Sequence, residues 1–222
     1  MTEERETATF RLGYVPGVTP GKWTRVWAER RPRVPLELVA ATTGEAVRQI
    51  RTGAVDAAVL RLPIDRTGLH AIPLYTETTV VVVLREHVVT AAEEVTVVEL
   101  ADEIVLHPQD DILSWPGDRP GRTAAHDPAT TAEAVELVAA GVGLLLVPQS
   151  LARLHHRRDL TYRPVADAPG SGVALVWPDA EKTELMEEFI GIVRGRTAHS
   201  SRTPRREGPP PARTRSAGRR RR

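Results

Sequence analysis

The sequence contains no cysteine, and only 4% of its 222 residues are aromatic. Without cysteine the chain can form no disulfide, carries no thiol nucleophile and offers no thiolate to a metal ion. No apolar run approaches the roughly 18 residues that a membrane-spanning helix needs, and the start, MTEERETATF, is acidic and lacks the apolar run of a secretory signal. We therefore expect a soluble, cytoplasmic protein with no membrane partner.

The formal net charge of +1 hides an uneven distribution of charged residues. Residues 196–222 hold ten of the 30 basic residues and one of the 29 acidic ones, which leaves 20 basic and 28 acidic residues before them. Because this tail is rich in arginine and proline and poor in apolar residues, we expect it to be disordered, as we do residues 1–9. The alternative role for the tail is weak, nonspecific contact with nucleic acid, since arginine attracts phosphates.

The clearest pattern lies in residues 36–63, LELVAATTGEAVRQIRTGAVDAAVLRLP. An aliphatic strand is followed by Thr42 and Thr43, either of which can cap a helix through its hydroxyl. The apolar residues that follow recur at helical spacing, and Gly53 suits the left-handed position that ends a helix. The run from 56 to 60 is typical of a parallel strand that is buried on both faces. The stretch is therefore predicted to be one βαβ unit, whose loops at carboxyl ends of strands are where such sheets bind ligands.

The rest of the chain repeats this strand–helix pattern. Other strands are expected at 10–15, 78–84, 104–106, 122–126, 144–147, 160–165 and 173–177. Thr19 is the expected cap of the first helix, with Pro20 as its first residue, and Pro178 and Asp179 are expected to open the last helix. Residues 69–74 are expected to be a short connection. The predicted domains are one lobe of residues 10–77 and 172–195 and a second of residues 78–171, joined by two crossings.

Several stretches together resemble the effector-binding domain of LysR-type transcriptional regulators. They are FRLGYVPG, WAERRPRVPLELVAATTGEAVRQIRTGAVDAAVLRLP, LADEIVLHPQD and AEAVELVAAGVGLLLVPQSLARL, and the match runs from about residue 10 to 194. The resemblance implies the type 2 periplasmic-binding-protein fold, in which two α/β lobes are joined by two crossover strands. It also implies a small-molecule effector in the cleft between the lobes, and a homodimer. Because the first strand begins at residue 10, we expect a stand-alone sensor without the family's winged helix-turn-helix.

The resemblance also places candidate ligand-binding residues in that cleft. They are Thr19, Thr42, Thr43, Arg61 and Pro63 in the first lobe, and Pro108, Gln109, Thr130 and Pro148 in the second. Helix amino termini with hydroxyl caps and free amides bind carboxylates and other anions, so the expected effector is a small anion such as a carboxylate. Two interpretations of these residues stay open. The threonines can serve only as caps, and Arg61 can pair with an acid of the protein instead of with an effector.

Other polar features have ordinary structural interpretations as well as functional ones. His107 at a strand end can be a structural histidine or a ligand contact. Asp110 and Asp111 form a possible acid–base pair, but acids in a loop of this kind usually serve as turn residues. His155 and His156 are adjacent, so they point differently on a helix, and no third metal ligand is evident.

No pattern in the sequence indicates an enzyme. The sequence has no nucleophile elbow, zinc-protease motif or phosphate loop. We therefore expect a non-catalytic regulatory module that needs no cofactor. The alternative is a protein–protein role, in which the domain pairs with a full-length LysR-type regulator and changes its output.

Overall fold

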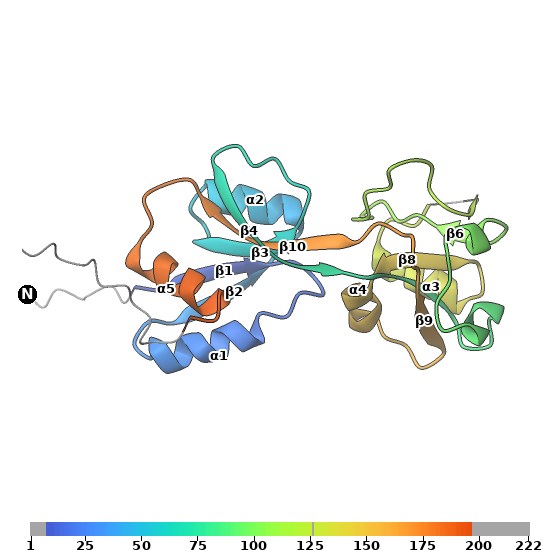
Figure 1. The fold of residues 1–222 in the computed structure, drawn as a ribbon, viewed down its shortest axis with the longest axis horizontal. Coiled ribbons are helices and arrows are strands. Elements are labelled where there is room, and N and C mark those ends of the chain that lie inside the picture. The colour runs from blue at the N-terminus through green and yellow to red at the C-terminus, as the bar shows by residue number, and fades with distance from the viewer. Residues whose placement is uncertain (1–7, 126, 197–222) are drawn as a thin grey trace, which may run out of the picture.

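The computed structural model describes residues 8–125 and 127–196, which form two lobes lying side by side (Figure 1). Each lobe is built on a five-stranded sheet. The sheet of the first lobe has the order β2 (Leu36–Ala40), β1 (Phe10–Tyr14), β3 (Ala57–Arg61), β10 (Ser171–Pro178) and β4 (Leu69–Glu77). The sheet of the second lobe has the order β7 (Arg122–Thr123), β6 (Ile104–Leu106), β8 (Leu144–Pro148), β5 (Thr79–Leu84) and β9 (Leu160–Pro164).

Five α-helices cover these sheets in the part of the chain that the structure describes. The first lobe carries α1 (Gly21–Arg30), α2 (Thr43–Arg51) and α5 (Glu184–Val193), and the second carries α3 (Thr131–Ala139) and α4 (Gln149–Leu154). Two short 3-10 helices, η1 (Val88–Ala91) and η2 (Val98–Leu100), belong to the second lobe. The chain passes from one lobe to the other twice, between β4 and β5 and again between β9 and β10, which confirms the predicted fold class.

The direction of the strands determines which loops share an edge of each sheet. In the first lobe β1 runs parallel to both β2 and β3, and in the second lobe β6 runs parallel to both β7 and β8. The loops that follow these strands therefore gather at one edge of their sheet. The strand β3 is buried along its whole length, as predicted, but it has a parallel partner on one side only, because β10 pairs with it antiparallel.

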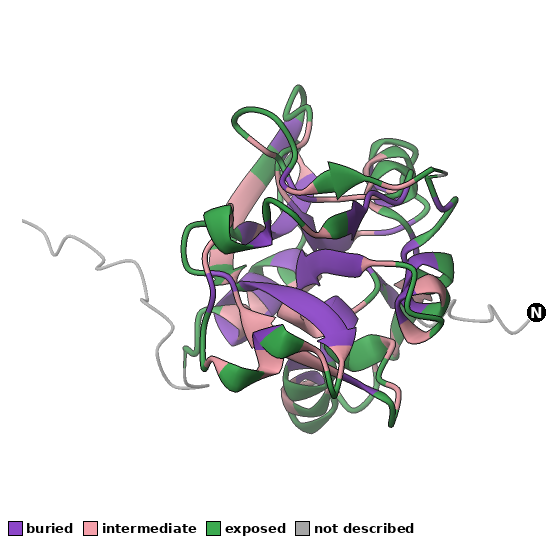
Figure 2. Cartoon of the chain, turned by 90° about the vertical axis from the view of Figure 1, so that its right-hand side faces the viewer, coloured by how far each residue is buried: buried purple, intermediate pink, exposed green. Residues whose placement is uncertain are grey.

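The core of the first lobe is held by three aromatic rings from distant parts of the sequence. Phe10, Trp27 and Phe189 lie with ring centroids 4.9–5.9 Å apart, and each is at most 1% exposed. Trp27 also donates a hydrogen bond from Nε1 to the carbonyl of Val34 at 2.8 Å. Since Phe189 belongs to α5, the last helix packs on the first lobe, as the sequence predicts. The buried strands run through the middle of the molecule while helices and loops expose their outer faces (Figure 2).

The second lobe has a core on each face of its sheet. The side chains of β5 alternate, so that Val80 and Val82 pack with α3 and α4, while Val81 and Val83 pack with the segment around η1 and η2. The run of four valines is thus a strand buried on both sides.

Residues 69–77 are a nine-residue strand, so the prediction of a short connection there is wrong. Pro73 in this segment argues against a central strand, because proline cannot donate a hydrogen bond to a neighbour. The strand β4 tolerates it at the edge of the sheet, where the register with β10 shifts between Val173 and Ala174, opposite Pro73 and Tyr75. An edge position and a bulge are the two places where a sheet accepts proline.

Two predicted helix starts are also wrong. The cap of α1 is Pro20, whose own backbone is helical (φ −76°, ψ −1°), and no side chain caps this helix. The helix α5 begins at Glu184, where the hydroxyl of Thr183 accepts a hydrogen bond from the amide of Met186. A threonine cap three residues before a bonded amide therefore replaces the expected start at Pro178 and Asp179.

Candidate functional site

The carboxyl edges of the two sheets face each other. The strand β3 ends at Arg61, and its guanidinium donates from Nη2 to the hydroxyl of Ser150 in α4, 2.8 Å away. The helix α4 follows directly on β8, so this bond joins the carboxyl end of a strand in one lobe to the carboxyl end of a strand in the other. The helix α4 lies on the side of the second lobe that faces the first (Figure 1).

The amino terminus of α2 stands at this edge of the first lobe, and part of it is already occupied. Thr42 and Glu45 form a capping box, in which the Thr42 hydroxyl accepts from the amide of Glu45 and the Glu45 carboxylate accepts from the amide of Thr42. These bonds hold the pKa of Glu45 below its ordinary value. Among the described residues, the amides of Thr43 and Gly44 and the hydroxyl of Thr43 have no hydrogen-bond partner.

The amino terminus of α3 is the matching position in the second lobe, and the protein's own acids occupy part of it. Asp110 Oδ1 accepts from both the amide and the hydroxyl of Thr131, at 2.7 and 2.9 Å. Thr130 caps the helix by accepting from the amide of Glu133, whose carboxylate in turn accepts from the amide of Ala129. The sequence suggests free amides at both helix starts, but the structure leaves them free at α2 and not at Thr131.

Arg61 is buried, at 4% exposed, which is unusual for a charged side chain. Its guanidinium makes three contacts besides that with Ser150. Nε and Nη2 lie 3.0 and 2.9 Å from Glu77 Oε2, and Nη1 donates to the carbonyl of Pro16 at 2.7 Å. All three of its nitrogens are therefore engaged by the protein itself, which is the structural pairing that the sequence left open.

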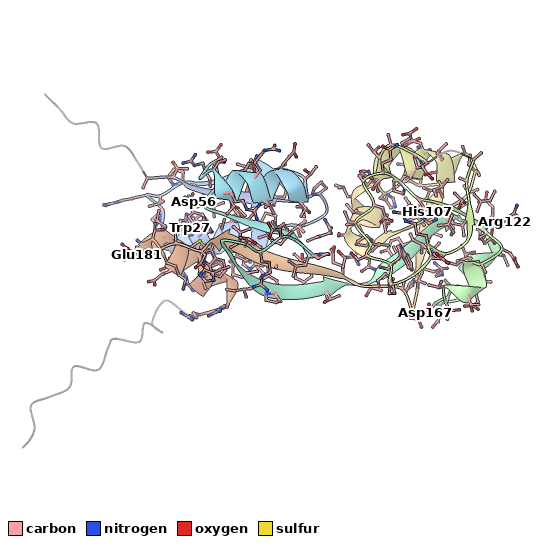
Figure 3. All side chains as sticks on the ribbon, turned by 90° about the horizontal axis from the view of Figure 1, so that it is seen from above. Trp27, Asp56, His107, Arg122, Asp167 and Glu181 are labelled. Carbon is pink, nitrogen blue, oxygen red and sulfur yellow. The ribbon has the colours of Figure 1, made fainter. Side chains whose placement is uncertain are left out.

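His107 and Asp111 are a buried titratable pair beside the candidate site in the second lobe. Burial lowers the pKa of the His107 imidazole, with the charge of Arg119 acting in the same direction. Burial raises the pKa of the Asp111 carboxyl, while hydrogen bonding from Leu113 and the nearby charge of Arg119 oppose that rise. His107 lies within the second lobe, away from the labelled Trp27 and Asp56 of the first (Figure 3). Desolvation thus favours the uncharged form of both groups.

The remaining candidate residues differ in exposure. Thr19 and Pro63 are exposed in the first lobe, and the peptide bond from Leu62 to Pro63 is cis. Pro108 and Pro148 are buried in the second lobe. Gln109 is exposed, and its amide donates to the carbonyl of Pro128, which brings it next to the loop before α3.

Three hollows found among the described residues are lined by residues of the second lobe alone. Their volumes are about 390, 320 and 190 Å³. His155 and His156 line the second of these, beside Arg85 and Arg157. Across residues 8–125 and 127–196, no group of three or more histidine, aspartate or glutamate side chains is arranged to hold a metal ion. Nor does that part of the chain contain a helix of the length and apolarity needed to cross a bilayer.

The order of strands, the two crossings and the facing edges agree with the result of a family comparison. Residues 3–198 match the model of the LysR substrate binding domain. The chain belongs to this family. The LysR domain is 29% identical over 201 residues to a probable hydrogen peroxide-inducible genes activator of Mycobacterium avium, covering 84% of this chain and 64% of that protein. It is 24% identical over 208 residues to the Hca operon transcriptional activator HcaR of Escherichia coli, covering 87% and 70%.

Solved structures show the same fold. The effector-binding domain of BenM with its effector benzoate superposes with a TM-score of 0.71 at 22% identity, over 85% of this chain and 91% of that one. The oxidized form of OxyR superposes with a TM-score of 0.70 at 23% identity, over 85% and 95%. The chain thus has the fold of these domains, and its match spans less than two thirds of the length of the Mycobacterium avium relative.

The sequence analysis did not find the three residues that hold Arg61 at the contact between the lobes. Glu77, Pro16 and Ser150 surround Arg61, at separations of 16, 45 and 89 residues along the chain. No local pattern joins residues so far apart. Only the burial of the strand that ends at Arg61, visible as the apolar run before it, indicates that this arginine needs a partner inside the protein.

Proposed function

We propose that this LysR domain binds a small-molecule effector between its lobes, without catalysing a reaction and without a cofactor. The observation that carries the proposal is the amino terminus of α2, where the amides of Thr43 and Gly44 and the Thr43 hydroxyl have no partner among the described residues. The proposed contact residues remain those predicted from the resemblance. They are Thr19, Thr42, Thr43, Arg61, Pro63, Pro108, Gln109, Thr130 and Pro148.

The proposed effector carries a carboxylate or another acceptor group that binds at α2. Free amides at the start of a helix favour negative charge, whereas at α3 an anion would have to displace Asp110 from Thr131. Benzoate is the effector of BenM, and a small carboxylate of this kind has the chemistry that α2 fits. A thermal-shift screen of small carboxylates, amino acids and aromatic acids against the purified chain would identify the ligand.

Thr43→Val is expected to weaken binding of the ligand found in that screen about fivefold, or about 1 kcal/mol, because valine keeps the volume and removes the hydroxyl. It should change the stability of the unliganded protein little, since that hydroxyl has no partner among the described residues. Isothermal titration and urea unfolding measure the two effects.

Thr42→Val is the matched control, because its larger effect should be on stability instead of on binding. It removes the cap of α2, which accepts from the amide of Glu45, and should lower the free energy of unfolding by about 1 kcal/mol. If both variants bound the ligand with unchanged affinity while a substitution at a distant surface abolished binding, the site between the lobes would be wrong.

We also propose that the domain forms a homodimer through the first lobe. Among the described residues, the strand β2 pairs only with β1, which leaves its other edge open, and Leu38 within it is 42% exposed. An open edge with an apolar side chain is suited to a second protein surface. Light scattering at micromolar concentration should give about twice the mass of the chain, and Leu38→Glu should give the mass of one. A single-chain mass for the unsubstituted protein at every concentration would contradict this proposal.

The same edge supports a second candidate, in which the domain pairs with a full-length LysR-type regulator. Mixing experiments separate the two functions, because an effector-binding module saturates with a small molecule whether or not a relative is present. We further propose that the chain acts in the cytoplasm as a sensor that reads no specific DNA sequence itself. DNA retention with and without residues 196–222 tests the second part of this proposal. The deletion should remove any salt-sensitive, nonspecific retention.

A further inference from the structure

In the part of the chain that the structure describes, one polar side-chain contact joins the two lobes away from the crossings. Within the first lobe, Glu77 and the carbonyl of Pro16 hold the Arg61 guanidinium from two sides. Its position therefore does not depend on the second lobe. Its Nη2 atom then reaches the hydroxyl of Ser150. Because the planar guanidinium loses little freedom on making this last bond, it is well prepared to hold the partner lobe.

The contact is close enough to leave no room for a side chain at Gly17. A Cβ atom there would lie 2.7 Å from Ser150 Oγ, 3.1 Å from Arg61 Nη2 and 3.2 Å from a methyl of Leu151. Gly17 also has a positive φ of 83°, which other residues adopt rarely. The loop between β1 and α1 reaches toward α4 (Figure 1). The loop, the guanidinium and the start of α4 therefore form one packed junction.

The crossings next to this junction have the features of a hinge. The amide of Gln149 donates to the carbonyl of Thr78 in the first crossing, and the Thr79 hydroxyl donates to the carbonyl of Pro169 in the second at 2.6 Å. A Cβ atom at Gly170 would lie 2.6 Å from a methyl of Thr76, so the two crossings touch. Rotation of the lobes about the two crossings can leave the bond of Gln149 intact, because that bond is made to a crossing. The adjacent Ser150 can then move away from the first lobe.

We propose that Ser150 and Arg61 form a latch that holds the lobes in the closed arrangement. When the latch opens, only the bond to Ser150 breaks, because Arg61 and Glu77 lie in the same sheet and stay paired. The charge of Arg61 therefore remains compensated in both states, and the difference between them is one charge-assisted hydrogen bond and the packing at Gly17. A contact of that size can be made and broken reversibly, which a switch between two arrangements requires.

The test measures the distance between the lobes in the unliganded protein. Spin labels on Arg48→Cys in α2 and Ala140→Cys at the end of α3 report that distance, and the chain has no cysteine of its own to interfere. Labelled chain is diluted with unlabelled chain, so that pairs between protomers are rare. The parent should give one dominant distance. Ser150→Ala should add a second, longer population, and Gly17→Ala should do the same by forcing the loop and α4 apart.

Ser114→Ala is the matched control, because it makes the same change at an exposed position of the second lobe and should leave the parent distribution unchanged. Thermal unfolding of each variant confirms that it is folded. A distribution for Ser150→Ala that is indistinguishable from the parent would overturn the latch. Since no effector enters this experiment, that failure would leave the proposed effector-binding function untouched.

Discussion

Arg61→Met is expected to lower the free energy of unfolding by about 3–5 kcal/mol, because it leaves the carboxylate of Glu77 buried without its cation. The two side chains are only 5% and 8% exposed, so water cannot replace the lost partner. Methionine keeps the apolar stem and most of the volume, which limits the effect to the charge and its hydrogen bonds. Urea unfolding followed by tryptophan fluorescence measures the loss, since Trp23, Trp27 and Trp177 all lie in the core of the first lobe.

Two further variants isolate the cause. Arg66→Met makes the same substitution at an exposed position of the first lobe and should change stability by less than about 0.5 kcal/mol. The double variant Arg61→Met with Glu77→Met should recover most of the loss, because neither charge is then left buried alone. A loss below about 1 kcal/mol for Arg61→Met alone would mean that this pair is not isolated from water.

Phe189→Ala is expected to cost a similar amount, about 3–5 kcal/mol, through a cavity in the core of the first lobe. Phe189 is fully buried, and its ring lies 5.0 Å from that of Phe10 and 5.9 Å from that of Trp27. The substitution removes the aromatic contact of the last helix with the first strand and the first helix. Urea unfolding measures the loss, and the fluorescence of the native state should also change because Trp27 loses a neighbour.

Leu154→Ala is the control for this second substitution. It also shortens a large apolar side chain in a helix, but Leu154 is 54% exposed and lies in the second lobe. It should therefore cost less than about 1 kcal/mol. Equal losses for the two variants would show that stability does not depend on the aromatic cluster.

The parts of the fold that follow from local chemistry were predictable from the sequence. Between residues 36 and 61 the strand pattern, the threonine cap and Gly53 all point to the same arrangement, and the structure has it. The valines at 80–83 similarly indicate a strand buried on both faces, because only such a strand uses every position for the core.

The failures come from places where tertiary context overrides a local signal. Pro73 argues against a strand, and only the position of β4 at an edge, beside a shifted register, makes a strand there acceptable. Pro178 and Asp179 have the residue types of a helix start, but the helix begins at Glu184, after Thr183, whose hydroxyl caps it. In both cases the local preference is real, but the position of the segment in the fold decides which structure forms.

In the candidate site, too, the contacts between nearby residues were predictable and those between distant residues were not. The capping box at α2 can be read from Thr42 and Glu45, which stand three residues apart. The occupation of α3 cannot, because Asp110 is 21 residues from Thr131 and reaches it only once the second lobe has folded. The partners of Arg61 are equally distant in sequence. A sequence can therefore indicate which polar groups need a hydrogen-bond partner. Whether the protein or a ligand supplies that partner depends on the fold.

The position of β10 in the first sheet has a consequence for how the protein is made. This strand, Ser171–Pro178, lies between β3 and β4, so those two earlier strands have no partner between them until residues 171–178 have been made. Every strand of the second sheet comes from the continuous stretch of residues 79–164. On the ribosome the second lobe thus has all its strands first, and the amino-terminal lobe is the last to close.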